Sequence, residues 1–328
     1  MKLLIVIQHR FDLWNTPDWF TEKLRETFPQ LEVVALDNYD GAESHLRDAD
    51  MAFTISLRPD QFAVARKLRW IHAPSAAVHQ LLFPEMINSD VVITNSREVH
   101  GPVVAEHVIA MVYALARKIP QATRLQVQQR WGQQEIWEEG PRPREVTGAT
   151  LGLIGIGGIG RTVARLASAV GMRVIASREN VNQPKPEGIS EVFPPTALDE
   201  LLCQSDFVVV APPLTPATRG LMNAQRLSAM RKDAFLINVG RGPLVDEAAL
   251  AEALRNCTIA GAALDVFDQE PLPSDSPLWG LDNLLITPHT AGLTEKLWPR
   301  HFELLSENIH RFIAGEPLLF VVDKHRGY

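Results

Sequence analysis

Three residues of different chemical type each follow an apolar segment in the second half of the sequence. Arg241 lies in NVGRG, Glu270 in DQEPLP and His289 in TPHTAG. The apolar segments before them have the length of buried strands. Strands of one parallel sheet end along a common edge, where α/β proteins bind their ligands. We therefore predict that an arginine, an acid and a histidine meet at one site.

This combination of residues suits the reduction of a 2-keto acid by a hydride. The forked guanidinium of Arg241 can bind a carboxylate and polarise the neighbouring carbonyl. The alkoxide that hydride transfer produces needs a proton, and a histidine, with an ordinary pKa of about 6.5, can donate one near neutral pH. Glu270 would bind the other ring nitrogen of His289 and favour its charged form. Each residue alone also has an ordinary structural interpretation, so the catalytic hypothesis rests on the three together.

The stretch LGLIGIGGIGR has the glycine pattern of a dinucleotide-binding turn. Gly155, Gly157 and Gly160 satisfy the spacing G-x-G-x-x-G between a strand and a helix. The first glycine permits a tight turn, the second lets the backbone approach a pyrophosphate, and the third lets helix and strand pack closely. Free N–H groups at the start of the helix then hold the phosphates. We predict a bound dinucleotide, with Gly158 and Ile159 also in the binding turn.

The residue that ends the next strand, in VIASREN, indicates which dinucleotide is bound. An acid at this place binds the ribose 2′-hydroxyl of NAD, whereas a carboxylate would repel the 2′-phosphate of NADP. Here the place is taken by Ser177 and Arg178, which can both donate hydrogen bonds to a phosphate. We predict NADP; NAD is the alternative if Arg178 is solvated and Glu179 binds the ribose.

The composition argues against several classes of partner. The formal net charge is −7 and no run of lysine or arginine forms a basic stripe, so neither nucleic acid nor an anionic membrane is expected as the main partner. No segment approaches the roughly 18 apolar residues of a membrane span. Cys203 and Cys257 are the only cysteines, so we expect no disulfide framework and a reducing, cytoplasmic location.

Several further histidines and tryptophans have no assigned chemistry. His72, His79, His100 and His107 lack the spacing of metal ligands, so we expect no metal site and structural or solvated roles for most of them. For the tryptophans two interpretations stay open, packing and contact with substrate. These residues are Trp131, Trp137 and Trp298.

Short apolar segments alternate with helical patterns over the first hundred residues. The expected strands are 3–7, 31–36, 51–56, 69–73 and 91–95. Thr16 is a candidate N-cap for the first helix, with Pro17 at the first helical position. This alternation predicts a doubly wound parallel sheet.

A second alternation begins at Thr150. The expected strands are 151–155, 172–176, 207–211, 234–239, 259–266 and 284–288. Before them we expect a buried apolar helix at 101–117, a polar helix at 121–134 and a proline-rich loop at 138–148, and after them an amphipathic helix near 295–314. The whole chain is therefore predicted to be α/β, with two doubly wound parallel-sheet domains.

The order of the motifs resembles that of the D-isomer-specific 2-hydroxyacid dehydrogenases over nearly the whole chain. The matching motifs are VAEH (104–107), GLIGIGGIGR, APPLTPATRGL (211–221), NVGRG, ALDVFDQEPLP with SPLW, and TPHTAG. The resemblance implies a Rossmann dinucleotide-binding domain at 99–290, inserted into a flavodoxin-like substrate domain made of 1–98 and 291–328. It also implies a homodimer joined through the cofactor domains and an active site between the two domains.

The resemblance also assigns residues to the cofactor. Asp265 matches the family residue that contacts the nicotinamide carboxamide. Pro212, Thr218, Val239 and Gly292 match further cofactor-side positions. In lacking an acid at position 178, the sequence resembles the NADP-using glyoxylate/hydroxypyruvate reductases of the family.

For the substrate, the resemblance points to the loop after RWIHAP. The backbone N–H groups of Ser75, Ala76 and Ala77 match the segment that holds the substrate carboxylate, together with Arg241. The family usually has glycine and an acid in this segment, and here Ala77 and His79 stand instead. The resemblance thus implies a small 2-keto or 2-hydroxy acid as substrate without selecting its side chain.

Other functions of the same fold are alternatives. The carboxyl-terminal-binding corepressors keep a similar arginine, acid and histidine as dinucleotide sensors, with extra terminal regions that we do not expect here. Formate dehydrogenases have glutamine in place of the acid that pairs with histidine, so Glu270 argues against them. An NAD-dependent dehydrogenase of another 2-hydroxy acid also stays open.

Overall fold

The structure, a computed structural model, describes residues 1–327 and folds them into two units. The first unit comprises Met1–His100 and the residues from Thr294 onward, and the second comprises Gly101–Leu293. The domain boundaries expected from the sequence, after residues 98 and 290, lie a few residues earlier. Each unit contains one parallel sheet covered by helices, so the predicted α/β fold class is confirmed.

The first unit is built on a five-stranded parallel sheet with the order β2-β1-β3-β4-β5. The strands are β1 (Lys2–Val6), β2 (Glu32–Leu36), β3 (Met51–Thr54), β4 (Trp70–Ala73) and β5 (Val92–Asn95). All five coincide with strands expected from the sequence. Their parallel direction brings the loops that follow them to one edge of the sheet.

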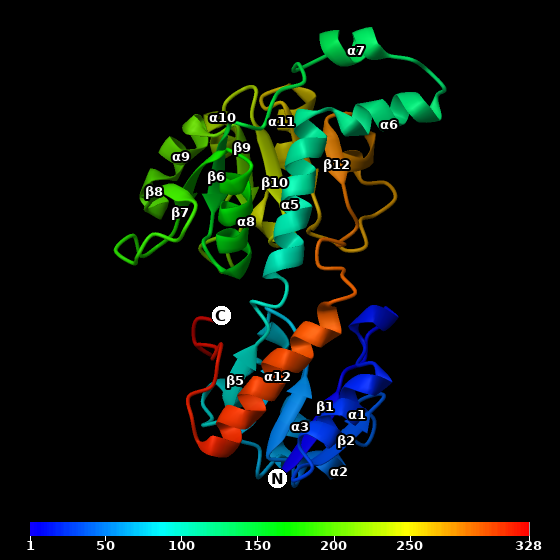
Figure 1. Cartoon of the computed structure of the whole chain (residues 1–328), viewed down its shortest axis with the longest axis vertical. Coiled ribbons are helices and arrows are strands. Elements are labelled where there is room, and N and C mark those ends of the chain that lie inside the picture. Colours follow the sequence, from blue (N-terminus) through cyan, green and yellow to red (C-terminus); the bar gives the residue numbers. More distant parts are fainter. Residues whose placement is uncertain (328) are drawn as a thin grey trace. The chain divides into compact units, whose positions relative to one another are not determined.

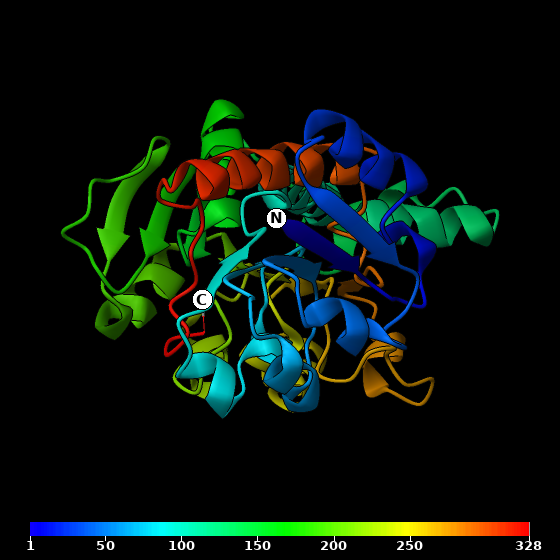
Figure 2. The same cartoon turned by 90° about the horizontal axis from the view of Figure 1, so that it is seen from below.

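Alternate residues of these strands enter two separate cores. Leu3 and Ile5 of β1 share one core with residues of α1 (Asp18–Thr27) and α12 (Leu297–Ala314). Leu4 and Val6 share the other with residues of α2 (Ala42–Leu46) and α4 (Pro84–Ile87), and α3 (Pro59–Val64) packs against it. Figure 2 shows α12 in orange-red beside α1 in blue, with the remaining helices of the unit across the sheet.

The first helix begins later than the sequence suggested. The prediction that Thr16 caps α1 is wrong, because Pro17 holds the N-cap position and the helix begins at Asp18. The carbonyl of Pro17 accepts a hydrogen bond from the N–H of Phe20 at 2.9 Å, as the carbonyl of a cap residue does. The Thr16 hydroxyl is buried and has no hydrogen-bond partner among residues 1–327.

The second unit is built on a seven-stranded parallel sheet with the order β12-β11-β10-β9-β6-β7-β8. The strands are β6 (Thr150–Ile154), β7 (Arg173–Ser177), β8 (Ile189–Phe193), β9 (Phe207–Val210), β10 (Phe235–Asn238), β11 (Gly261–Leu264) and β12 (Leu284–Ile286). Strand β8 was not predicted. It is an edge strand with exposed residues at its centre, so its sequence, ISEVF, lacks the apolar run of a buried strand.

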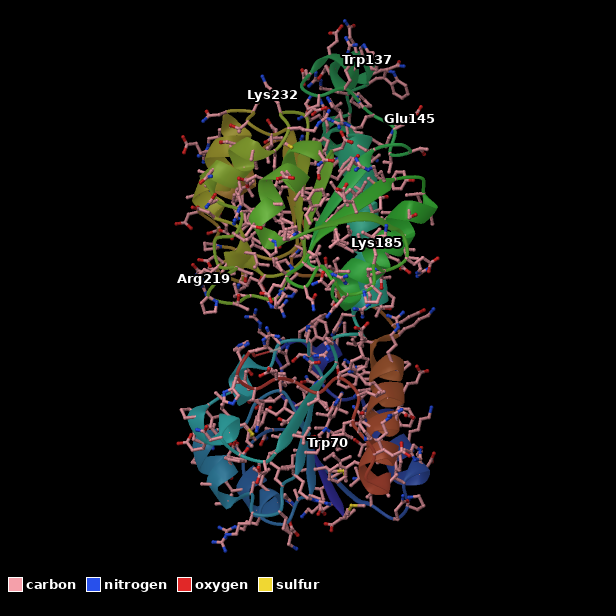
Figure 3. All side chains as sticks on the ribbon, turned by 90° about the vertical axis from the view of Figure 1, so that its left-hand side faces the viewer. Trp70, Trp137, Glu145, Lys185, Arg219 and Lys232 are labelled. Atoms are coloured by element: carbon pink, nitrogen blue, oxygen red, sulfur yellow. The ribbon has the colours of Figure 1, made fainter. Side chains whose placement is uncertain are left out.

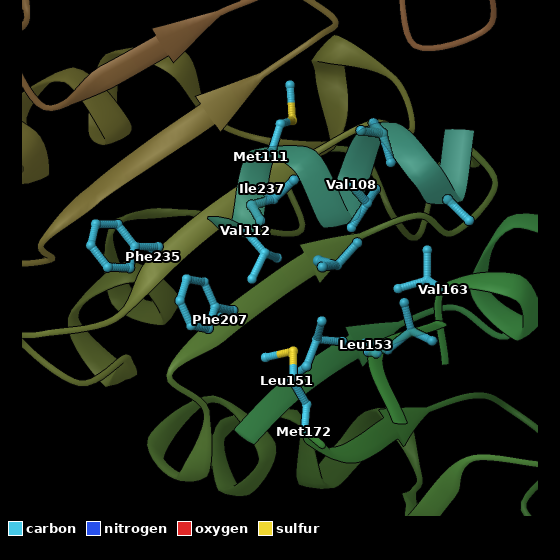
Figure 4. Packing of buried hydrophobic residues seen from close by; sticks show 14 of the residues in the cluster. Val108, Met111, Val112, Leu151, Leu153, Val163, Met172, Phe207, Phe235 and Ile237 are labelled. Carbon is cyan, nitrogen blue, oxygen red and sulfur yellow. The ribbon is translucent and has the colours of Figure 1, made fainter. Parts of the chain in front are cut away.

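Helix α5 (Gly101–Ala116) is central to one face of this sheet. Its residues Val108, Met111 and Val112 are buried, and Figure 4 shows them facing apolar residues of β6, β9 and β10. Helix α8 (Gly158–Ala169) packs beside α5 on the same face. The apolar sequence of α5, predicted to be buried, is therefore explained by packing inside the second unit.

The opposite face of the sheet is covered by three shorter helices. They are α9 (Leu198–Gln204), α10 (Ala224–Ala229) and α11 (Glu247–Arg255). Short 3-10 turns lie at Asp12–Trp14, His79–Leu81, Pro195–Ala197, Gly242–Leu244 and Pro277–Gly280. Over residues 1–327, none of the helices combines the length and the apolar character needed to cross a bilayer.

Residues 119–143, called the projecting segment below, form an excursion whose outer part extends away from the rest of the second unit (Figure 1). Nearer the unit, Arg124 donates to the carbonyl of Asp282 at 2.8 Å. The segment contains α6 (Ile119–Val127) and α7 (Gln133–Glu138). The single helix predicted over 121–134 is wrong, because Gln129 has a φ of 55° and a left-handed residue ends a helix. Figure 3 shows Trp137 at the outer end of this segment.

Candidate active site

Arg241, Glu270 and His289 lie in three loops at the same edge of the second sheet. Arg241 follows β10, Glu270 follows β11 and His289 follows β12, and these three strands are neighbours in the sheet. Residues after neighbouring parallel strands lie close together because the strands are only about 5 Å apart. The structure therefore brings the three predicted residues to one region of the second unit.

Glu270 and His289 form the closest pair in this group. Nδ1 of His289 lies 2.6 Å from Oε2 of Glu270. The other oxygen of Glu270 accepts a hydrogen bond from the N–H of Phe267 at 2.9 Å. The carboxylate is thus fixed at both oxygens, and Nε2 is the ring nitrogen of His289 that faces away from the pair. The His289 side chain is 52% exposed, so the ring can meet a molecule that arrives from solvent.

Arg241 is partly buried beside this pair. Burial lowers the pKa of its guanidinium, and the negative charge of Glu270 partly opposes that effect. The guanidinium donates to the carbonyl of Gly240 at 2.7 Å. The turn that carries Arg241 is held by Asn238, which donates to the carbonyl of Arg241 at 3.0 Å and accepts from the N–H of Gly240 at 3.1 Å. Asn238 is buried and was not singled out from the sequence.

The loop that carries His289 is held by Asp265. His289 has a positive φ of 54°, which is uncommon for a residue with a side chain. Its N–H donates to the carbonyl of Asp265 at 2.9 Å. The buried carboxylate of Asp265 accepts from the hydroxyl of Thr287 at 2.6 Å and from the N–H groups of Thr290 and Ala291 at 2.8 and 3.0 Å. The carboxylate of Asp265, predicted as a cofactor contact, therefore also supports the loop.

The glycine turn has the close contacts that the pattern predicts. Gly155 has a φ of 95°, and a Cβ there would lie 2.8 Å from the backbone of Pro212. A Cβ on Gly160 would lie 2.2 Å from the carbonyl oxygen of Gly155. A Cβ on Gly157 would meet nothing within 4 Å, so this glycine leaves open space at the start of α8. The open space at Gly157 is compatible with a pyrophosphate, and its binding by Gly157 and Gly158 stays a prediction.

Ser177 and Arg178 lie at the end of β7, beside the glycine turn. Ser177 is buried. The guanidinium of Arg178 donates to the carbonyls of Gln183 and Pro184, the latter at 3.2 Å. Its Nε atom is buried and has no hydrogen-bond partner among residues 1–327. A guanidinium with an unsatisfied buried donor fits a position that binds an anion.

Further predicted cofactor residues lie along the same sheet edge. Pro212 follows β9 and contacts the glycine turn, and Val239 follows β10. The Thr218 hydroxyl donates to the carbonyl of Pro213 at 2.7 Å and so closes the turn after β9. Gly292 directly follows the loop held by Asp265. Their contact with a cofactor stays a prediction.

The predicted substrate loop, Ser75–Ala77, follows β4 in the first unit. Its carbonyl groups are held from inside the unit: Asn95 donates to the carbonyl of Ala76 at 2.8 Å, and the N–H of Ser96 donates to that of Ser75 at 3.1 Å. The Ser75 hydroxyl donates to the carbonyl of Ala77 at 2.6 Å. The loop thus has a defined conformation, and its binding of a carboxylate stays a prediction.

Two buried histidines support the strands under this loop. His72 lies 2.7 Å from the Thr94 hydroxyl through Nδ1 and 3.1 Å from the Ser96 hydroxyl through Nε2. Nδ1 of His301 lies 3.1 Å from the same Ser96 hydroxyl. Burial lowers the pKa of His72 to about 3, and burial also lowers that of His301 well below the ordinary value. Both rings are therefore neutral parts of the core near pH 7.

Metal ligands do not gather anywhere in the part of the chain that the structure describes. No group of three or more histidine, cysteine, aspartate or glutamate residues within residues 1–327 could hold a metal ion. The buried histidines contact serine and threonine hydroxyls instead.

Comparison with known proteins gives a consistent result. The NAD binding domain described for D-isomer specific 2-hydroxyacid dehydrogenases matches residues 109–291. A glyoxylate reductase from Korarchaeum cryptofilum is 33% identical over 83% of this chain and 82% of its own length.

Two solved structures are similar over almost the whole chain. A D-isomer specific 2-hydroxyacid dehydrogenase from Xanthobacter autotrophicus Py2, in complex with NADPH and MES, has 33% identity and a TM-score of 0.84, with 99% of each chain covered. An NADPH-dependent glyoxylate/hydroxypyruvate reductase from Sinorhizobium meliloti, in complex with NADP and sulfate, has 30% identity and a TM-score of 0.82, with 100% of this chain and 99% of that chain covered.

The substitution His72→Phe should reduce the pH dependence of stability. Folded His72 has a pKa of about 3, against an ordinary value of 6.5, so the unfolded chain takes up a proton at higher pH than the folded chain. The stabilisation by neutral His72 is complete above about pH 6.5 and is lost as the pH falls toward 3, by about 1.4 kcal/mol per pH unit. Urea unfolding between pH 7 and 4 should give a smaller slope for the variant, and equal slopes would contradict this.

Proposed function

Because the chain belongs to the D-isomer specific 2-hydroxyacid dehydrogenase family, we propose that it reduces a small 2-keto acid to the D-2-hydroxy acid with NADPH. The enzymes of this family are NAD(P)-dependent dehydrogenases of 2-hydroxy acids, so an oxidoreductase with a nicotinamide cofactor follows from membership. The observation that carries the proposal is the 2.6 Å contact between Nδ1 of His289 and Glu270, which leaves Nε2 of the ring to face a substrate.

His289 is the proposed proton donor. When the ring is charged, Nδ1–H donates to Glu270 and Nε2–H can donate to the carbonyl oxygen of the substrate. The bound cofactor supplies the hydride that reduces the carbonyl carbon. One proton moves from Nε2 of His289 to the former carbonyl oxygen, which becomes the hydroxyl. The ring then recovers a proton from solvent, which its 52% exposed side chain can reach.

Arg241 is the proposed binding residue for the substrate carboxylate. A 2-keto acid presents a carboxylate next to a carbonyl, and a guanidinium can contact both. Partial burial strengthens this attraction because fewer waters screen the charge. The backbone N–H groups of Ser75, Ala76 and Ala77 are proposed to hold the same carboxylate, although the acid usual for this segment is absent.

The dinucleotide is proposed to lie along the edge formed by the ends of β6, β7, β9 and β10. Gly155, Gly157, Gly158, Ile159 and Gly160 would hold the pyrophosphate, and Ser177 with Arg178 would bind the 2′-phosphate of NADP. Pro212, Thr218, Val239, Asp265 and Gly292 would contact the remaining cofactor. The unpartnered Nε of Arg178 supports NADP, as does the NADPH or NADP bound in two similar structures.

Glyoxylate and hydroxypyruvate are the first substrates to test. Related proteins are glyoxylate reductases or glyoxylate/hydroxypyruvate reductases. Both compounds are small 2-keto acids that the pair of Arg241 and His289 suits.

We also propose a reducing, cytoplasmic location, because both cysteines are free and exposed.

The active form is proposed to be a homodimer that forms through the projecting segment. Four large apolar side chains are exposed there: Ile119 at 53%, Val127 at 81%, Trp131 at 93% and Trp137 at 52%. A cluster of exposed apolar side chains of this kind indicates a protein–protein interface. The family resemblance implies a second copy of the same chain as the partner.

His289→Gln should lower kcat for glyoxylate with NADPH by about 10²–10⁴-fold, because no proton donor remains.

Arg241→Ala should raise KM and lower kcat, since it removes both the contact with the carboxylate and the polarisation of the carbonyl. Steady-state kinetics with glyoxylate, hydroxypyruvate and pyruvate measure both effects. His325→Gln, an exposed histidine near the end of the chain, is the control. Near-normal turnover of His289→Gln contradicts the assignment, and no turnover of any of these acids by the wild type favours a dinucleotide sensor.

Arg178→Ser should lower kcat/KM for NADPH about 10- to 100-fold and change that for NADH little. The reason is the loss of charge-assisted hydrogen bonds to the 2′-phosphate, worth about 1.5–3 kcal/mol. Arg173→Ser, at the other end of β7 and paired with Glu191, is the matched control. If the wild type uses NADH as well as NADPH, the proposed preference is wrong.

Trp131→Glu should convert the proposed dimer to a monomer, because a carboxylate cannot be buried in an apolar interface without a partner. Analytical ultracentrifugation of the purified chain measures the mass. Trp279→Glu changes another exposed tryptophan of the second unit outside the projecting segment, and it should leave the mass unchanged. A monomeric wild type would exclude the dimer.

A further inference from the structure

His107 lies in the motif VAEH, which has no role in the proposed reaction. Its Nε2 atom lies 3.1 Å from the hydroxyl of Thr287 and 3.7 Å from Oδ1 of Asp265. His107 is in α5 and Thr287 follows β12, so the contact joins residues that are 180 positions apart. The His107 side chain is 22% exposed and that of Asp265 is 2% exposed. This contact joins α5 to the loop that carries His289.

The hydrogen bonds in this group have a fixed direction. An ionised carboxylate only accepts, so the hydroxyl of Thr287 donates its single proton to Asp265 at 2.6 Å. The hydroxyl oxygen must then accept from His107, which places a proton on Nε2 of that ring. Burial lowers the pKa of His107, which agrees with a neutral ring that carries its one proton there. The hydrogen bonds therefore form a series in which His107 donates to Thr287 and Thr287 donates to Asp265.

Asp265 connects this group of hydrogen bonds to the backbone around His289. Its carboxylate accepts from the N–H of Thr290 at 2.8 Å and from that of Ala291 at 3.0 Å, and its carbonyl accepts from the N–H of His289 at 2.9 Å. These bonds hold the residues directly after His289 and His289 itself. A positive φ at a residue with a side chain costs about 1–3 kcal/mol and persists only where the surroundings impose it. At His289, the hydrogen bonds to Asp265 impose this positive φ.

We propose that His107 and Thr287 are positioning residues for His289: they orient the buried carboxylate of Asp265, and Asp265 holds the 287–291 loop in the conformation that presents the catalytic ring. The proposal rests on the proposed function only for the catalytic role of His289. Neither residue has to touch substrate, so removing them should change the placement of the proton donor and leave the carboxylate contact of Arg241, in the loop after β10, in place.

The test begins with Thr287→Val, which keeps the shape of the side chain and removes the hydroxyl. With NADPH and glyoxylate, kcat should fall about 10- to 100-fold while KM for glyoxylate changes less than threefold. Thr287→Ser restores the hydroxyl and should recover most of kcat. Thr258→Val, a threonine between α11 and β11, is the matched control and should behave as the wild type. Unchanged kcat in Thr287→Val overturns the proposal.

His107→Leu removes the other donor and allows a test of the shared route. If both residues act through Asp265, the double variant His107→Leu/Thr287→Val should lose no more activity than the more damaged single variant. Independent effects would instead multiply, which would contradict the series. Thermal unfolding of each variant shows whether the fold is kept. If His107→Leu does not fold, the comparison of kcat between Thr287→Val and Thr287→Ser decides whether the proposal holds.

A measurement without turnover separates this proposal from the proposed function. In protein with ¹⁵N-labelled histidine, the ring signals of His289 are identified by their loss in His289→Gln. They should shift or broaden in Thr287→Val and match the wild type in Thr287→Ser. Unchanged His289 signals in Thr287→Val overturn the positioning role, even if the enzyme is active. If no 2-keto acid is reduced by the wild type, the proposed function fails while the signals still test the positioning.

Discussion

Asp265 carries a carboxylate that is almost completely buried at the end of β11, and a buried charge is stable only where hydrogen-bond donors surround it. The Thr287 hydroxyl and the N–H groups of Thr290 and Ala291 supply these donors. Satisfying the carboxylate therefore determines the path of the chain from Thr287 to Ala291. His289 lies within that path, so the position of the proposed proton donor depends on an acid that has no need to react itself.

The parallel sheet of the second unit gives this loop its neighbours. Strands β10, β11 and β12 pair in parallel, so the residues that follow them lie at one edge. Arg241, Glu270 and His289 follow β10, β11 and β12, and Glu270 contacts His289. The glycine turn after β6 and Arg178 after β7 lie along the same edge. One architectural feature thus places the proposed proton donor, carboxylate-binding residue and cofactor turn at the edge of a single sheet.

Strands and the glycine turn were predictable because their signals are local. Apolar runs identified the buried strands, and only β8, an edge strand with exposed residues, escaped. The errors also have local causes. The helix expected over 121–134 is interrupted by Gln129, which has a left-handed conformation. The N-cap of α1 is Pro17, not Thr16. Neither departure follows from the helical pattern, because each depends on the conformation of one residue.

The sequence by itself determined the α/β class and the dinucleotide-binding domain, and it predicted that Arg241, Glu270 and His289 meet at one edge of a sheet, because residue type and position after a strand are written in the chain. Only the tertiary structure decided how these residues are held. The contact of His107 with Thr287 joins a helix to a loop 180 residues away, and no spacing in the sequence indicates it. Hydrogen bonds depend on distance and direction in space, so this support became visible only when α5 packed against the sheet.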